Sequence, residues 1–303
     1  MFEALIQMGA LILCGVVWRY VAPGGLEAGS TRTALTGLVY YLFLPALVLL
    51  VLWQAPLGTD SLKIALVASV AIVASLLLMA WLCNVCNMDG PTRGAALIAA
   101  AFPNATYLGL PVLEATLGKE ARSIAIQYDL FACTPLLLTV GVWVAMHYGN
   151  STEAKLKLNS LLKVPALWAA LLAVVLNMLA IPLPGGLRSW LQTLANGVVP
   201  LMLISLGLSL YVTRQHLQSM RSIFPVLGVK LFFMPAIVLA LSSALGMQGM
   251  LQQAVVLEAA MPSMVLGLIL CDRYGLNNVV YAAAVTASTA VSFLTLGPWF
   301  SMV

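Results

Sequence analysis

Three ionisable side chains lie inside long apolar stretches of the sequence and are the first candidates for chemistry. Asp129 and Glu258 are acids, and Lys230 is a base that could neutralise Glu258 or attract an anion. A charge inside a lipid-spanning helix is costly, so each of these groups needs a partner or a function. Asp129 or Glu258 could take up and release a proton and so couple proton movement to another process. The alternative is structural, with Glu258 and Lys230 as a buried pair and Asp129 as a helix cap or the partner of a hydroxyl group.

Two proline-interrupted segments, around Pro103 and Pro262, could expose backbone polar groups within the protein. Each proline removes an amide donor and clashes with the preceding helical turn, so we expect both helices to break there. If the two breaks cross, four half-helix ends converge, and the amino-terminal ends are electropositive and suit an anion. The alternative is a pair of kinked packing helices without a ligand. The predicted ligand-binding residues are Pro103, Asn104, Thr106, Tyr107, Pro262 and Ser263.

Composition shows what kind of protein must position these residues. Of 303 residues 62% are hydrophobic and only 8% are charged, whereas a soluble domain has about 25% charged residues. So few charges cannot cover a soluble surface, which excludes a soluble enzyme, a nucleic-acid binder and a disordered chain. The five cysteines are an odd number, and the lone pair Cys83 and Cys86 lacks the further ligands of a zinc site. We expect no disulfide framework, no metal and no resident cofactor.

The apolar runs predict an all-α polytopic membrane protein with the lipid bilayer as its surroundings. A helix needs about 20 residues to cross the hydrocarbon core. Cutting the sequence at proline, glycine and charge clusters gives ten spans, at roughly 4–22, 32–54, 61–84, 93–117, 122–146, 161–181, 188–212, 221–245, 251–271 and 277–301. Spans 4 and 9 are the two that carry the proline breaks.

The second half of the chain echoes the first. The tetrapeptide ending at Pro103 (Ala-Ala-Phe-Pro) recurs at Pro262 (Ala-Ala-Met-Pro), and similar matches link spans 2 and 7 and spans 5 and 10. Five spans per half reverse the orientation of the second half, which predicts an inverted repeat. We therefore divide the chain into a five-helix repeat at 1–148, a cytoplasmic linker at 149–160 and a second repeat at 161–303. Chance similarity between apolar segments is the alternative.

The basic residues predict the orientation. Of the 14 Lys and Arg residues, nine fall in one set of connections, four in the other, and Lys230 lies inside a span. The richer side is expected to be cytoplasmic, which places both termini on the outer or periplasmic side of the cell (inner) membrane.

In these motifs the chain resembles the auxin efflux carrier family in its short bacterial form. The resemblance covers essentially the whole chain and is most specific at Asn104–Pro111 (Asn-Ala-Thr-Tyr-Leu-Gly-Leu-Pro), at Met261–Pro262 and at Asp272–Gly275 (Asp-Arg-Tyr-Gly). The family is similar in fold to bile acid/sodium symporters. This implies ten helices in two inverted repeats, crossing helices 4 and 9, and an elevator-type movement of a transport domain against a scaffold, each drawing helices from both repeats.

The resemblance also implies a function. Bacterial relatives are described as permeases for malate, malonate or similar acids, and plant relatives export indole-3-acetate. Asn104 matches the crossover Asn of the family, whereas Ser263 stands where a second amide would be a fuller match. We therefore expect a secondary transporter of small organic anions and not an enzyme. Homodimers occur among related folds, and we carry that expectation to this chain.

The sequence leaves open which ion is coupled to transport, and it allows two other functions. Crossover prolines in this family are read as replacing sodium sites, which favours protons or no coupling, with a sodium-coupled symporter as the alternative. An intramembrane enzyme would need Asp129 and Glu258 to face each other. A sensor built on a transporter fold is the third hypothesis, although no signalling domain is attached.

Overall fold

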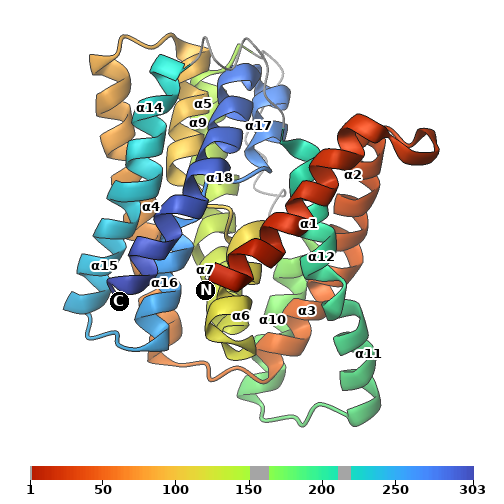
Figure 1. Ribbon diagram of the computed structural model, residues 1–303. Helices are drawn as coiled ribbons and strands as arrows, with labels where there is room; N and C mark the ends of the chain where they lie inside the picture. The colour runs from red at the N-terminus through yellow and green to blue at the C-terminus, as the bar shows by residue number, and fades with distance from the viewer. Residues whose placement is uncertain (1, 151–163, 211–219) are drawn as a thin grey trace.

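The computed structural model describes residues 2–150, 164–210 and 220–303, and every regular element in these ranges is a helix (Figure 1). Within them, six helical segments are long and apolar enough to cross a membrane: Ala28–Trp53, Thr59–Val85, Lys119–Tyr148, Gly185–Ser209, Ser222–Ala244 and Asn278–Ser301. The predicted all-α membrane architecture is therefore confirmed. The other four predicted spans correspond to shorter or interrupted helices, so the count of ten stays a prediction.

Most residues of the predicted linker at 149–160 lie outside the described residues, as do several of the basic residues used to predict the orientation. The division of the chain at 148 and 161 therefore stays a prediction.

The helices pack as two groups. The first group lies on the right of Figure 1 and contains α1 (Phe2–Val21), α2 (Ala28–Leu38), α3 (Leu44–Trp53), α10 (Pro165–Met178), α11 (Gly185–Asn196) and α12 (Val198–Ser209). The second group lies on the left and contains α4 (Thr59–Val85), α5 (Gly90–Ala101), α9 (Val142–Tyr148), α14 (Met220–Gly228), α15 (Met234–Ala244), α16 (Met250–Ala260), α17 (Gly267–Tyr274) and α18 (Asn278–Ser301). Three short helices, α6 (Leu110–Leu117), α7 (Arg122–Tyr128) and α8 (Thr134–Leu136), continue the second group and border the first.

Five wide π turns interrupt the described helices, and a proline follows four of them after one intervening residue. These four span Val39–Phe43, Ala105–Gly109, Asp129–Cys133 and Val229–Phe233, before Pro45, Pro111, Pro135 and Pro235, and the fifth spans Leu137–Gly141. Proline cannot donate the usual helical hydrogen bond, so the preceding turn widens and leaves a carbonyl without its normal partner. Pro235 in α15, for example, has no amide hydrogen to donate to the Leu231 carbonyl. This carbonyl instead accepts a hydrogen bond of 2.9 Å from the Trp299 indole.

Close backbone packing holds the first group together. Gly15 of α1 and Gly207 of α12 face each other, and a Cβ on Gly207 would overlap the carbonyl of Ile12. Only a residue without a side chain allows the two helices to approach so closely.

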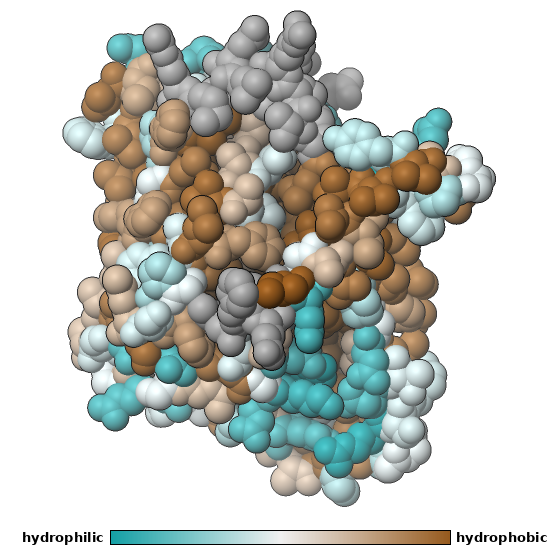
Figure 2. Space-filling view, in the orientation of Figure 1, coloured by the Kyte–Doolittle hydropathy of each residue, from teal (hydrophilic) through white to brown (hydrophobic). Residues whose placement is uncertain are grey.

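The molecular surface separates into apolar and polar regions. Large apolar side chains of α1, α4 and α10 are exposed, as expected of faces that contact lipid. Figure 2 shows apolar side chains over α1 and hydrophilic side chains gathered at the lower end, over α6 and α11.

Candidate functional site

The two proline breaks meet near the middle of the molecule. Extended residues around Pro103 and Ser263 pair as an isolated antiparallel bridge. The Asn104 amide donates a hydrogen bond of 2.8 Å to the Pro262 carbonyl, and the Met264 amide donates one of 3.1 Å to the Phe102 carbonyl. The structure therefore brings together the two breaks that the sequence predicts, joined through their main chains.

Two polar side chains satisfy the carbonyls that the breaks leave free. Pro103 has no amide for the Ala99 carbonyl, which instead accepts a hydrogen bond of 2.7 Å from the Ser263 hydroxyl. In the other helix, the Ala259 carbonyl accepts a hydrogen bond of 3.1 Å from Lys230 Nζ. A cation at a helix carboxyl end is electrostatically favourable, so Lys230 caps α16.

A small cavity opens beside the paired breaks, on the boundary between the two helix groups. Its volume is about 90 Å³. Asn104, Thr106 and Tyr107 line it from the first broken helix, and Asp129 lines it from the turn after α7. Its other lining residues are Tyr40, Leu44, Leu130, Thr134, Leu137, Leu138, Val164, Ala166, Met264 and Leu266. Both helix groups thus contribute to one cavity.

Asn104 presents an unused hydrogen-bond donor at this cavity. Its side chain is 2% exposed, and its Nδ2 atom has no partner among the described residues. The helix that begins at Ala105 also lacks a side-chain cap at Asn104, and the first backbone amides of a helix have no partner within the helix itself. Such a cluster of donors at a helix amino terminus suits a carboxylate oxygen.

Asp129 is the acidic group of the cavity. Its carboxylate accepts hydrogen bonds from the hydroxyl of Thr106 and, at 3.0 Å, from the hydroxyl of Thr134. Asp129 therefore joins the first broken helix to the turn before α8, and it is the one Asp or Glu among the described residues that line the cavity.

Glu258 and Lys230 are fully buried behind the cavity and do not line it. Lys230 Nζ contacts Met234 Sδ at 2.8 Å as well as the Ala259 carbonyl. Neither carboxylate oxygen of Glu258 has a hydrogen-bond partner in the described ranges, where no ion pair between Glu258 and Lys230 forms. The two groups are near enough to interact electrostatically, but the geometry gives Lys230 a capping position.

The structure thus sorts the predicted site residues into two sets. Asn104, Thr106, Tyr107 and Asp129 line one cavity, whereas the remaining predicted residues shape or support the breaks behind it: Pro103, Pro262, Ser263, Lys230 and Glu258. Tyr40 and Thr134 also line the cavity, although neither is among the residues predicted from the sequence. A signal was present, since Tyr40 lies in the π turn before Pro45 and Thr134 directly precedes Pro135.

Comparison with known proteins adds an independent observation. A family model described as membrane transport protein matches residues 3–300. A protein of Methanothermobacter thermautotrophicus named as an uncharacterized transporter is 28% identical over 300 residues, which cover 98% of this chain and 96% of that protein. A second uncharacterized transporter, from Methanocaldococcus jannaschii, is 26% identical over 209 residues, covering 68% of this chain and 67% of that protein.

Proposed function

Because the chain belongs to the membrane transport protein family, the auxin efflux carrier family that its sequence resembles, we propose that this multi-pass membrane protein is a secondary transporter of small organic anions. The substrates are carboxylates such as malate, malonate or auxin-like acids, bound where the two broken helices meet. The family and the relatives named as transporters favour this function over an intramembrane enzyme.

The observation that carries the proposal is the unpartnered Nδ2 donor of Asn104 in the cavity wall. Leaving a buried donor unsatisfied costs about 1–3 kcal/mol, and a bound carboxylate oxygen would recover that cost. The uncapped amides that follow Asn104 add further donors and the positive end of a helix dipole. The site is therefore built for an acceptor that carries negative charge.

The proposed mechanism is alternating access of the elevator type. The proposal includes ten membrane-spanning segments in two inverted five-helix repeats, with both termini on the outer side of the inner membrane. Tyr40 and Ala166 line the cavity from the first helix group, and Asn104 and Asp129 line it from the second. Sliding of the second group along the first would carry a ligand held by Asn104 and expose it on the other side.

Proton coupling follows from the position of Asp129. An anion in a cavity of about 90 Å³ lies close to this carboxylate. Two like charges about 5 Å apart repel each other by roughly 3 kcal/mol at an effective dielectric constant near 20. Anion binding is therefore linked to a neutral Asp129, so one proton enters together with the substrate.

Sodium coupling is the second candidate for the driving ion. The Asp129 carboxylate lies within hydrogen-bond distance of the hydroxyl oxygens of Thr106 and Thr134. Hard cations such as sodium prefer oxygen ligands of this kind. Malonate uptake is measured with and without sodium at one fixed pH. A sodium requirement supports the sodium-coupled alternative, and an equal rate supports protons or no coupling.

The test of the central site is uptake of malonate and malate by the purified protein in proteoliposomes. Asn104→Ala should lower the uptake rate about tenfold or more, because a hydrogen bond to a charged group contributes about 1.5–3 kcal/mol. Asn84→Ala is the matched control, since Asn84 is exposed on α4 and does not line the cavity. An Asn104→Ala protein that transports like the control removes Asn104 from the site.

A further inference from the structure

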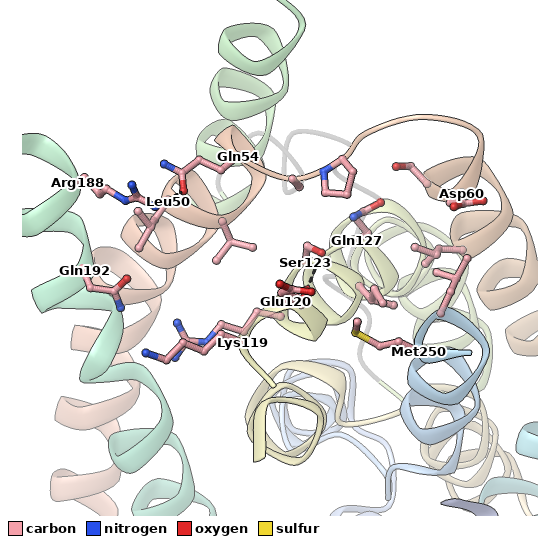
Figure 3. A pocket seen from close by; sticks show the side chains of 18 residues that line it. Leu50, Gln54, Asp60, Lys119, Glu120, Ser123, Gln127, Arg188, Gln192 and Met250 are labelled. Atoms are coloured by element: carbon pink, nitrogen blue, oxygen red, sulfur yellow. Dashed lines mark hydrogen bonds between the residues drawn. The ribbon is translucent and has the colours of Figure 1, made fainter. Parts of the chain in front are cut away.

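A second and larger cavity lies at one end of the molecule, and we propose that it is a docking site for small carboxylate anions on their way to the central cavity. This inference rests on the proposed function and adds to it a separate site with its own residues. The cavity has a volume of about 760 Å³ and opens where α3, α4, α7, α11 and α16 end or begin (Figure 3).

Both helix groups form the wall of this outer cavity. Arg188 and Gln192 come from α11 in the first group, and Lys119 comes from the turn before α7 in the second. Figure 3 shows the α11 side chains on one side, with Lys119 directed into the same space from the other element. A ligand held by Lys119 and Arg188 together would bridge the two groups.

The charges in the wall favour an anion. Lys119 Nζ has no hydrogen bond or ion pair among the described residues. Arg188 donates a hydrogen bond of 3.1 Å to Gln54 Oε1, a neutral partner that leaves its charge uncompensated. Two other ionic side chains of the wall are already paired, Asp60 with Lys63 and Arg122 with Glu114. Glu120 is the remaining acid of the wall, and Lys119 and Arg188, which form no ion pair among the described residues, outnumber it.

Buried polar atoms without partners also point to a ligand. Gln127 is 3% exposed and lines the cavity, yet its Oε1 atom has no hydrogen-bond partner in the described part of the chain. Arg122 is 6% exposed, and its Nε atom is likewise unpartnered. Unsatisfied buried groups of this kind are uncommon in native proteins. The Arg122 Nε–H could donate to a carboxylate anion, whereas Gln127 Oε1 is an acceptor that a water molecule bound beside the anion would satisfy.

The outer cavity leads toward the central one along α7. Ile124 and Gln127 line the outer cavity, and Asp129 lines the central cavity two residues later. Between them lies a small cavity of about 10 Å³, lined in part by Val48 and Ile126, which shares Asp129 with the central cavity. Apolar side chains thus separate the docking site from the central site in this conformation.

The test is malonate uptake into proteoliposomes at low ionic strength by Lys119→Gln and Arg188→Gln. We expect KM to rise about threefold to tenfold in each variant, with the maximal rate within about twofold, because capture is weakened and the central site is intact. Arg273→Gln is the matched control: it removes one charge from an exposed position on α17, outside the cavity wall. Lys119→Arg should keep the KM of the unmodified protein.

Salt provides the second readout. At 1 M ionic strength the screening length is about 3 Å, so the KM difference between Lys119→Gln and the unmodified protein should disappear. If both variants keep the KM of Arg273→Gln while Asn104→Ala loses uptake, the docking site is wrong and the proposed function stands. If the unmodified protein neither takes up nor is thermally stabilised by malonate or malate, the proposed function fails, and the docking inference fails with it.

Discussion

The carboxylate of Glu258 lies against the backbone of Gly109, so closely that a Cβ on Gly109 would overlap its oxygen atoms. Gly109 ends the π turn that follows the first break, and Glu258 lies in the last turn of α16 before the second break. This contact therefore fixes how closely the two broken helices approach each other. Glycine is required here by space, because its φ of −62° is ordinary helical backbone.

The Gly109–Glu258 contact gives the first prediction. Gly109→Ala should destabilise the protein by about 1–3 kcal/mol, since the added methyl group forces a shift in a fully packed region. Gly37→Ala is the control, because a Cβ on Gly37 of α2 meets no atom within 4 Å. Thermal melting in detergent measures both.

A double variant tests whether Glu258 is the obstacle. Combining Gly109→Ala with Glu258→Ala should recover part of the loss, because the smaller side chain leaves room for the methyl group. Strictly additive losses would contradict the steric explanation.

The second prediction concerns the pH dependence of transport. Uptake of malonate should rise as the external pH falls, because the anion enters with a proton on Asp129. In Asp129→Asn the group is permanently neutral, and uptake should become insensitive to pH while movement down a gradient continues. Asp60→Asn, a change in the outer cavity wall, should keep the pH dependence of the unmodified protein. An unchanged pH profile in Asp129→Asn would assign proton coupling to another group.

The third prediction concerns Lys230 as a cap. Lys230→Met removes the donor to the Ala259 carbonyl and should lower the free energy of unfolding by about 1–3 kcal/mol. Lys119→Met, at an exposed position, should change it by no more than about 0.5 kcal/mol.

Lys230 also lies within electrostatic range of Glu258. The double variant Lys230→Met/Glu258→Gln should therefore lose less stability than the sum of the losses in the two single variants, since it removes both buried charges together. If Lys230→Met alone has the melting temperature of the unmodified protein, the cap contributes little to stability.

The fourth prediction separates support from binding at the second break. Ser263 is fully buried, and its hydroxyl is used by the Ala99 carbonyl. Ser263→Ala should destabilise the protein by about 1–3 kcal/mol, while KM for malonate stays within about twofold. Ser301→Ala, which removes an exposed hydroxyl bonded to the Gly297 carbonyl, should have little effect on either measurement. A large rise of KM in Ser263→Ala would return Ser263 to the binding site.

Composition and the properties of single residues determine the helical membrane architecture and the two helix breaks of this protein. Sixty-two per cent hydrophobic residues with few charges can only be accommodated in a lipid-embedded helical protein. Pro103 and Pro262 had to break their helices, because proline lacks an amide hydrogen wherever it stands in a fold. These properties belong to single residues or to composition, so the sequence alone determines them.

Tertiary structure decided which of the candidate groups share a cavity. Asp129 and Asn104 belong to successive predicted spans, and they line one cavity only because the turn after α7 packs beside the first break. From the sequence, Ser263 and Lys230 are candidates for contact with a ligand. In the structure they instead donate hydrogen bonds to the carbonyls of Ala99 and Ala259. An unsatisfied buried carbonyl takes whichever donor the packing brings to it, and that choice depends on distances between helices that no local pattern encodes.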